Sequence, residues 1–465
     1  MMRSLFSGVS GLKNHQTRMD VIGNNISNVN TTGYKSSRVN FSDMLSQNLT
    51  GASAPNDNIG GTNPKQIGLG SAVASVDLLF TNGSVQSTGV NTDLALSSTN
   101  ALFILNTGNG TAYTRNGDFQ FDADGNYVQA GNGYYVQGWM GNDGNIDTGA
   151  KVTNITIPSG KTMAPKASTE AKYTNNLNAE VPTITAVTDK DGNPASGSTA
   201  DADNPLTVTL SDGSTMTMTS GSYKIGHSLP IVTTLSVYDS LGSVHNVAVY
   251  FKLTSAADDL WQVSLSNVDG ESTQTIDEPD GSTTTVTMAA RTLKFDTNGA
   301  KPVGSGTTVL ALTNGATTTQ SVQLDFSALT QYSSSSTIAG KANGNAAGTL
   351  SSVSIDKTGT ITGTYTNGEK MVEAQVALQR FNNPGGLTKI GESLYEESNN
   401  SGISGSPNTA AALGATITPA SLEMSNVDIA NEFTDMIITQ RGFQGNSKII
   451  TVSDEMLETL INMKR

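Results

Sequence analysis

Both ends of the chain carry apolar residues at intervals of seven, and this repeat constrains the fold more than any other feature of the sequence. Residues seven apart form one stripe along an α-helix. The repeat consists of Leu5, Leu12, Met19 and Ile26 near the N-terminus, and of Ile429, Met436, Phe443, Ile450 and Leu457 near the C-terminus. We therefore predict helices within residues 1–30 and 425–465, each with a narrow apolar stripe.

The predicted C-terminal helix has suitable residues at both of its ends. Ser425 or Asn426 fits the N-cap position, where a side-chain oxygen accepts a hydrogen bond from a free backbone N–H. Lys464 and Arg465 suit the negative end of the helix dipole. A helix of roughly 40 residues would be about 60 Å long.

Neither predicted helix is expected to be stable by itself. Glycines interrupt both helices, and each costs about 1 kcal/mol of helix stability relative to alanine. In the C-terminal helix, the second heptad position that a stable coiled coil fills with aliphatic residues is polar. A buried Leu or Ile contributes about 1.5 to 3 kcal/mol, but only when another surface covers it. The glycines are Gly8, Gly11, Gly23, Gly442 and Gly445, and the polar positions are Gln440, Ser447 and Asp454. Either the helices pair inside one chain, or helices of different subunits approach closely at the glycines and become ordered on assembly.

The sequence between the predicted helices has a different pattern. Residues 72–420 show the two-residue alternation and the regular turns of β-hairpins. In one of them, strand residues up to Phe121 precede a turn at Asp122 and a second strand at Tyr127. The segment 31–75 is rich in Gly, Asn, Thr and Ser and has no sustained period, so we expect an extended connector there.

These patterns predict a multidomain α+β fold. Two mainly antiparallel β domains would be nested between terminal helices that form a coiled-coil-like domain. The composition changes near residue 165, where the chain becomes especially rich in Thr, Ser, Asp and Gly. The expected parts are a helical domain of residues 1–30 plus 425–465, a connector 31–75, an inner β domain 76–164 plus 336–424, and an outer β domain 165–335 inserted in the inner one.

Charge and composition disfavour several classes of protein. A net charge of −14 without a cluster of Lys or Arg makes nucleic-acid binding an unfavourable hypothesis. The chain has no cysteine, which excludes disulfides, zinc–thiolate sites and cysteine nucleophiles. It has no run of about 18 apolar residues, so we expect no membrane insertion. Residues 1–12 are too polar for a secretory signal, so any export is expected to proceed without a cleaved signal peptide.

No motif in the sequence points to catalysis, a cofactor or a metal. His15, His227 and His245 are far apart in sequence, and none belongs to a known metal-binding or nucleophile motif. The acidic turns that begin at Asp122 and Asp189 lack the glycine and glutamate positions of a calcium loop, so we interpret them as turns with a left-handed glycine. Two distant carboxylates could still form a glycosidase site, which leaves that alternative open.

Three groups of residues carry a resemblance to a known family. The first is a polar segment after the N-terminal helix, with the signature residues Asn24, Asn25, Asn28, Asn30, Thr32, Gly33 and Lys35. The second comprises residues 88–96, 113–119 and 136–139, and the third comprises residues 420–428 and 440–444. Together they resemble the axial proteins of the bacterial flagellum, which include rod, hook and hook-junction proteins. Residues 237–242 and 247–251 are similar to the outer domain of the hook members, which rod members generally lack.

The resemblance implies a structural function with no enzymatic activity, cofactor or metal. The chain would pass through the flagellar type III export apparatus and polymerise beneath a cap into a curved, flexible tube outside the cell. This tube would act as a universal joint that transmits torque from rod to filament. The implied partners are further copies of the chain, rod, hook cap and hook–filament junction proteins, and the export apparatus, but neither nucleic acid nor membrane.

Two alternative functions also fit parts of the sequence. Residues 48–66 resemble a connector insertion found in rod proteins and in only some hook proteins, which favours a distal rod protein of the same family. A secreted β-rich adhesin or glycan-binding protein is an alternative from a different class, and it would be a stable monomer with ordered ends.

Overall fold

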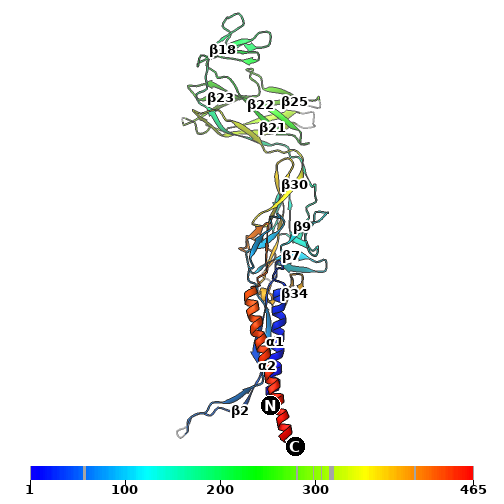
Figure 1. Cartoon of the computed structure of the whole chain (residues 1–465). Coiled ribbons are helices and arrows are strands. Elements are labelled where there is room, and N and C mark those ends of the chain that lie inside the picture. Colours follow the sequence, from blue (N-terminus) through cyan, green and yellow to red (C-terminus); the bar gives the residue numbers. More distant parts are fainter. Residues whose placement is uncertain are drawn as a thin grey trace. The chain divides into compact units, whose positions relative to one another are not determined.

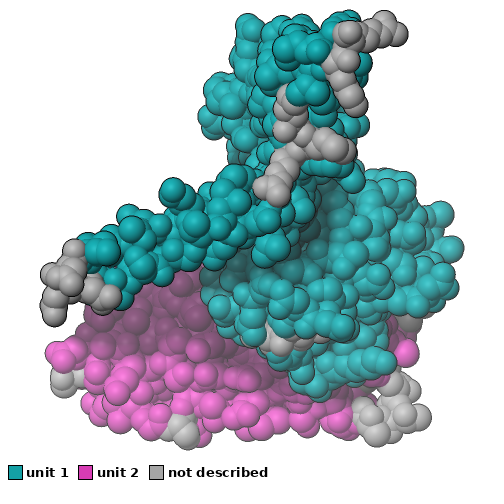
Figure 2. All heavy atoms as spheres, turned by 90° about the horizontal axis from the view of Figure 1, so that it is seen from below, with its two compact units in different colours: residues 1–161, 350–365, 370–465 teal, residues 162–349, 366–369 magenta. Residues whose placement is uncertain are grey.

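The computed structural model describes residues 2–55, 59–278, 281–296, 298–304, 306–313, 319–402 and 405–463. The chain divides into two compact units, which Figure 2 shows in separate colours. Unit 1 comprises Met1–Lys161, Leu350–Tyr365 and Lys370–Arg465, and unit 2 comprises Thr162–Thr349 and Thr366–Glu369. The described chain is mostly β-sheet with a long helix near each end, which confirms the prediction of helical ends and a β-rich middle.

The two long helices belong to unit 1 and lie side by side (Figure 1). They are α1 (Met2–Ser27) and α2 (Ile429–Met463), and α2 is about 50 Å long at 1.5 Å per residue. The N-cap of α2 is Asp428, whose Oδ1 accepts a hydrogen bond from the N–H of Ala430 at 2.9 Å. The prediction of Ser425 or Asn426 as N-cap was therefore wrong. Lys464 and Arg465 lie outside the described residues.

A two-stranded ribbon follows α1, in the segment where the sequence indicated an extended connector. Its inner part pairs β1 (Ser37–Asp43) with β4 (Ser71–Leu78), and its outer part pairs β2 (Ser46–Thr50) with β3 (Lys65–Gly68). Every residue of β2 and β3 is exposed, and the outer part projects away from the helices (Figure 1). Because this part of the ribbon has no buried face, its sequence lacks the apolar alternation that would identify the strands.

The β body of unit 1 is built around a large sheet that carries side chains packed on both of its faces. The strand β7 (Ala101–Asn106) lies inside this sheet, and Phe103 and Leu105 enter one hydrophobic cluster while Leu102 and Ile104 enter another. Its other strands in unit 1 are β8 (Thr111–Thr114), β9 (Phe119–Phe121), β10 (Tyr127–Gln129), β11 (Tyr135–Asn142), β12 (Asn145–Ile146), β13 (Thr153–Asn154), β30 (Gly348–Ile355, from Leu350 on), β31 (Thr360–Tyr365), β32 (Lys370–Val376), β33 (Leu378–Arg380), β34 (Thr388–Gly391) and β35 (Leu394–Glu396).

Two short strand pairs connect the N-terminal and C-terminal halves of unit 1. The strand β5 (Val85–Ser87) pairs with β37 (Ser421–Glu423), and β6 (Leu94–Leu96) pairs with β36 (Ile417–Pro419), both antiparallel. A 3₁₀ turn, η1 (Pro384–Gly386), precedes β34. The pairing of β5 with β37 brings the segment before α2 next to the segment that follows the ribbon.

Unit 2 is a β-sandwich with a smaller module beside it. The sandwich core takes residues from both sheets, and Tyr173, Phe251 and Phe326 pack their rings together at its centre. One sheet consists of β21 (Ile231–Tyr238), β22 (Val244–Ser255), β23 (Leu260–Ser264) and β26 (Arg291–Lys294). The other consists of β15 (Glu170–Asn178), β24 (Thr273–Asp277), β25 (Thr283–Met288), β27 (Thr307–Thr313), β28 (Gln320–Tyr332) and β29 (Ala339–Ala342), with β15 and β28 parallel. The strand β14 (Thr162–Met163) also belongs to unit 2 and pairs with the first two residues of β30.

The smaller module of unit 2 has its own hydrophobic core. Ile184, Val208 and Tyr223 are among the buried residues of this core. Its strands are β16 (Ile184–Thr188), β17 (Thr199–Ala200), β18 (Leu206–Leu210), β19 (Thr215–Met218) and β20 (Gly221–Ser222). The first and last parts of the module meet where Thr183 forms an isolated β-bridge with Ser228.

Candidate functional site

The contact between α1 and α2 is antiparallel and contains both polar side chains and the apolar side chain of Ile450, which lies against Gly8. At one end Asn25 Nδ2 donates to Glu432 Oε1 at 2.9 Å, and at the other the hydroxyl oxygens of Ser4 and Ser453 lie 3.4 Å apart. The two buried residues of α2 among those described, Thr439 and Ser453, are both polar. We call the α2 residues at this contact the polar seam, and they recur every seven positions as Glu432, Thr439, Asn446 and Ser453.

Glycines allow the two helices to approach closely within one chain. A Cβ added to Gly11 would lie 2.6 Å from the side chain of Asn446, and one added to Gly442 would lie 2.6 Å from the ring of His15. Burial, and secondly the charge of Arg18, lower the pKa of His15 below its ordinary value of 6.5, which favours the uncharged imidazole at this contact. By contrast, added Cβ atoms at the two glycines Gly23 and Gly445 would meet open space.

The apolar stripe predicted from the sequence lies beside the polar seam. In α1, the four stripe residues Leu5, Leu12, Met19 and Ile26 are half-buried. In α2, Met436, Ile450 and Leu457 are half-buried, whereas Ile429 is 45% exposed and Phe443 is 42% exposed. Other exposed apolar residues of α2 are Phe433, Ile437, Ile438, Ile449, Val452, Met456, Leu460, Ile461 and Met463. The contact with α1 therefore leaves much of the apolar surface of α2 uncovered in the described chain.

The signature segment folds into the junction where the helices meet the β body, and two asparagines hold its backbone. The Asn25 amide donates to Ser37 O at 2.9 Å and accepts from Ser37 N at 3.0 Å, as a neighbouring peptide group would. Asn426 accepts from Ser36 N at 2.8 Å and donates to Leu79 O at 2.7 Å. The end of α1 and the segment before α2 thus bind two consecutive residues of the same chain segment.

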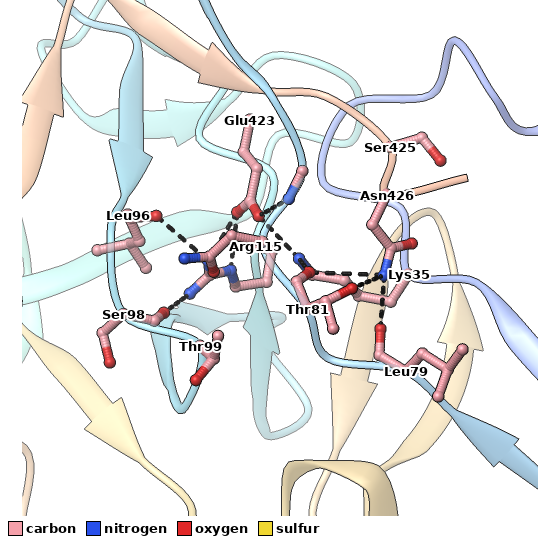
Figure 3. A network of polar contacts seen from close by, with 12 residues as sticks. Lys35, Leu79, Thr81, Leu96, Ser98, Thr99, Arg115, Glu423, Ser425 and Asn426 are labelled. Atoms are coloured by element: carbon pink, nitrogen blue, oxygen red, sulfur yellow. Dashed lines mark hydrogen bonds and ion pairs between the residues drawn. The ribbon is translucent and has the colours of Figure 1, made fainter. Parts of the chain in front are cut away.

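A buried ionic network lies beside Asn426 (Figure 3). Lys35 Nζ lies 2.7 Å from Glu423 Oε1 and donates to Thr81 O at 2.6 Å. Arg115 Nε donates to Glu423 Oε2 at 2.9 Å, and its Nη2 lies 2.8 Å from the same oxygen. The side chains of Lys35, Arg115 and Glu423 are each no more than 1% exposed. We call these three residues the junction network.

Further hydrogen bonds satisfy most of the remaining polar atoms of the junction network. Arg115 donates from its two Nη atoms to the carbonyl groups of Ser98, Ala101 and Leu96 and to Asn82 Oδ1. Glu423 Oε1 accepts from Gly83 N at 2.9 Å. Burial lowers the pKa of Lys35 and of Arg115, and the charge of Glu423 opposes this effect in both.

The other signature residues lie around this junction. The Tyr34 hydroxyl donates to Asn24 Oδ1 at 2.6 Å, and Asn28 Nδ2 donates to Asn24 O at 2.8 Å. Thr32 is half-buried, whereas Asn30 is exposed. The structure therefore brings Asn24, Asn25, Asn28 and Lys35 together, and leaves Asn30 at the surface.

Sequence reasoning did not identify Arg115, Glu423 or Asn426 as parts of a site. All three lie in segments that resemble the axial proteins, but the resemblance assigned no role to them. One signal was available, because only 14% of the residues are charged and Arg115 directly follows β8, three of whose four residues are buried. A charged residue next to a buried strand in such a chain indicates a buried ion pair, although the sequence does not identify its partner.

Replacing Gly33 with alanine is expected to destabilise unit 1 more than an ordinary glycine replacement. Gly33 has φ +66°, and an added Cβ would lie 2.4 Å from the backbone nitrogen of Asn116. The left-handed conformation alone costs a residue with a Cβ about 1–2 kcal/mol, and the overlap adds to this cost. Gly89 is a matched control because its φ is +74° and an added Cβ meets open space. Denaturant unfolding should show a larger loss for Gly33→Ala than for Gly89→Ala, and equal losses would contradict the assigned contact.

Four segments of the chain match family models of flagellar axial proteins. Residues 5–35 match the flagella basal body rod protein, and residues 99–179 match the flagellar hook protein FlgE/F/G D1 domain. Residues 227–345 match the flagellar basal body protein FlaE D2 domain, and residues 418–463 match the flagellar basal body rod FlgEFG protein C-terminal model. In the described residues, neither helix is long and apolar enough to cross a membrane.

Similarity to proteins named flagellar hook protein FlgE extends over the whole chain. The Treponema pallidum protein of this name is 37% identical over 501 residues, and that of Borreliella burgdorferi is 38% identical over 491, with 100% of both chains covered in each comparison. The crystal structure of Helicobacter pylori flagellar hook protein FlgE2 matches 73% of this chain and 100% of its own, at 17% identity and a TM-score of 0.40. On the strength of the full-length identities, the chain belongs to the flagellar hook protein FlgE family.

Proposed function

We propose that this chain is the structural subunit of the bacterial flagellar hook and that its copies assemble through their terminal helices. The observation that carries this proposal is the uncovered apolar surface of α2. Ile437 is 58% exposed and Ile461 is 64% exposed, and Phe443 lies between them in the sequence. A helix with this many exposed large apolar side chains is typical of a protein–protein interface.

The polar seam supports assembly between copies rather than a closed helix pair. Polar residues occupy part of the contact between α1 and α2, and the stripe residues Ile429 and Phe443 remain exposed and available to another molecule. A second copy offers the same half-buried stripe on its own α1 and α2, so it has apolar surface to cover this one. Burial of a large apolar side chain contributes about 1.5–3 kcal/mol, and several per helix would stabilise a coiled-coil-like tube of helices.

The outer parts of the chain suit a joint that bends while the helical tube resists twist. Charged residues make up only 14% of the sequence, so contacts between β surfaces of neighbouring copies would depend on hydroxyl and amide groups and on bridging water. Such contacts are individually weak and exchange easily, which lets copies slide as the tube rotates around a bend. In this function the tube transmits torque from rod to filament as a universal joint.

The proposed function assigns the chain its partners and its place in the cell. The partners are further copies of the chain, the rod, the hook cap and the hook–filament junction proteins, and the type III export apparatus before assembly. The chain would act outside the cell, in the hook, after export without a cleaved signal peptide. Its function would be structural, with no reaction catalysed.

Concentration-dependent assembly tests this proposal directly. The purified chain should sediment as a monomer when dilute and form tubes visible by electron microscopy when concentrated. Amide hydrogen exchange in α1 and α2 should slow markedly on assembly, because the helices become covered only then. A chain that stays monomeric at high concentration, with both helices already protected, would contradict the proposal and favour the adhesin alternative.

A further inference from the structure

Three chain segments that are distant in sequence meet at the junction network. They are residues 33–37, which follow α1, residues 79–84, which follow the ribbon, and residues 421–426, which precede α2. The chain connections between the helices, the ribbon and the β body pass through these segments. Their relative positions therefore determine how the helices are attached to the β body within unit 1.

Glu423 binds all of these segments and the β body at once. Its backbone carbonyl accepts from Gly33 N at 2.8 Å, and its carboxylate accepts from Lys35 and from Gly83 N at 2.9 Å. The same carboxylate binds Arg115, which lies between β8 and β9 of the β body. Asn426 adds a second connection, because it binds Ser36, Leu79 and Thr81.

The chemistry of the junction network fixes the relative positions of the segments that it joins more than it adds to the stability of the fold. A buried ion pair contributes little net stability relative to well-packed apolar residues, because both ions lose their hydration. Its hydrogen bonds are short and directional, however, so a segment cannot shift without breaking several of them. Apolar contacts of equal area would tolerate small displacements. A cluster with two cations and one carboxylate is also sensitive to the exact position of Glu423, since that carboxylate is the shared partner of both.

We infer that Glu423 is the positioning residue of a rigid junction that transmits twist from the terminal helices to the β body. This inference rests on the proposed function, in which torque enters the tube through the helices. Twist applied to α1 and α2 reaches the β body through the three segments bound to Glu423. Backbone pairing of β5 with β37 and the bonds of Asn426 also join these segments. The junction network adds side-chain bonds to these joins, and without it the segments have more freedom to shift against one another.

Lys35→Met is the variant that tests this inference with least risk to folding. It removes the bonds from Lys35 Nζ to the Glu423 carboxylate and to Thr81 O, and it leaves the backbone bond from Gly33 N to Glu423 O in place. Glu423 keeps Arg115 and Gly83 N as side-chain partners, so the remaining ion pair is neutral. The control is Lys161→Met, which removes a lysine from another buried carboxylate of unit 1, that of Glu373, where Nζ and Oε2 lie 2.6 Å apart. Lys161 is 32% exposed and Lys35 is 1% exposed, so the control tests the loss of a lysine–carboxylate pair away from the junction. Asn426→Ser is a second test variant. It removes the bonds to Ser36 and Leu79, and no buried charge loses its partner.

The measurement is the torsional stiffness of assembled tubes, obtained from the angular fluctuations of a bead attached to one end. Tubes of Lys35→Met and of Asn426→Ser should form at normal length and be at least twofold softer in twist, and Lys161→Met tubes should match the unaltered chain. Normal stiffness in both test variants, or equal softening in the control, would overturn the inference and leave the proposed function intact. Failure of the unaltered chain to form tubes would instead remove the proposed function and, with it, the inference.

Discussion

Phe443→Ala should raise the protein concentration needed for assembly by about tenfold or more, while both β-rich units stay folded. Phe443 is 42% exposed in the single chain, so assembly can bury about two-fifths of its surface, and about that share of the cost of losing the ring falls on the polymer. Loss of a fully buried phenylalanine ring costs roughly 3–5 kcal/mol, and each 1.4 kcal/mol corresponds to a factor of ten in an equilibrium constant. Sedimentation of polymer against soluble chain over a concentration series measures the effect.

Gln440→Ala is the matched control for this variant. Gln440 is an exposed residue of α2, one turn before Phe443, and it is not part of the apolar stripe. Its replacement should leave the critical concentration within about twofold of that of the unaltered chain, because exposed substitutions have small effects. If Phe443→Ala assembles as readily as Gln440→Ala, the stripe does not form the contact between copies.

Glu423→Gln should lower the free energy of unfolding of unit 1 by about 3–5 kcal/mol. The variant keeps the shape of the side chain and removes its charge, so Lys35 and Arg115 remain as buried cations without a counter-ion. The cost is that of two uncompensated charges held away from water. Asp77→Asn is the control, because Arg38 and Asp77 form an ion pair at 3.7 Å with side chains 60% and 40% exposed, and such pairs contribute at most about 1 kcal/mol.

The two tryptophans allow each unit to be followed separately in this experiment. Trp139 is buried in unit 1 and Trp261 in unit 2, and the chain has no others. In a Trp261→Phe background, the fluorescence of Trp139 reports unfolding of unit 1, and the reverse substitution reports unit 2. Glu423→Gln should shift the first transition and leave the second unchanged. A transition of Trp139 at the same denaturant concentration as in the control would show that the junction network contributes no stability.

The positions of the helices and the β-rich character of the middle could be predicted from periodicity. A seven-residue repeat and a two-residue alternation each reflect a buried face, and both helices and most of the body strands have one. The predicted N-cap of α2, Ser425 or Asn426, lies three or two residues before the observed N-cap Asp428. The sequence does not distinguish them, because all three residues have side chains suited to an N-cap. In the structure the side chain of Ser425 accepts instead from Val427 N, and Asn426 binds Ser36 and Leu79.

The ribbon and the junction network could not be predicted in this way. The strands β2 and β3 are exposed along their whole length, so no burial pattern marks their pairing. In the junction network, Lys35 and Glu423 are 388 positions apart, and nothing local to either residue indicates the other. The signature residues marked the right part of the chain. Their role became visible only when folding brought residues 79–84 and 421–426 beside them.

The small module of unit 2 has a consequence for how chains of this family can differ in size. Thr183 and Ser228 pair directly, so the polypeptide enters and leaves the module at one place, and residues 180–226 fall between the two neighbouring family matches. A lobe with its own core and adjoining ends can be acquired, exchanged or lost as a cassette without rerouting the chain around it. The same geometry makes this position suitable for grafting a foreign epitope onto the protein.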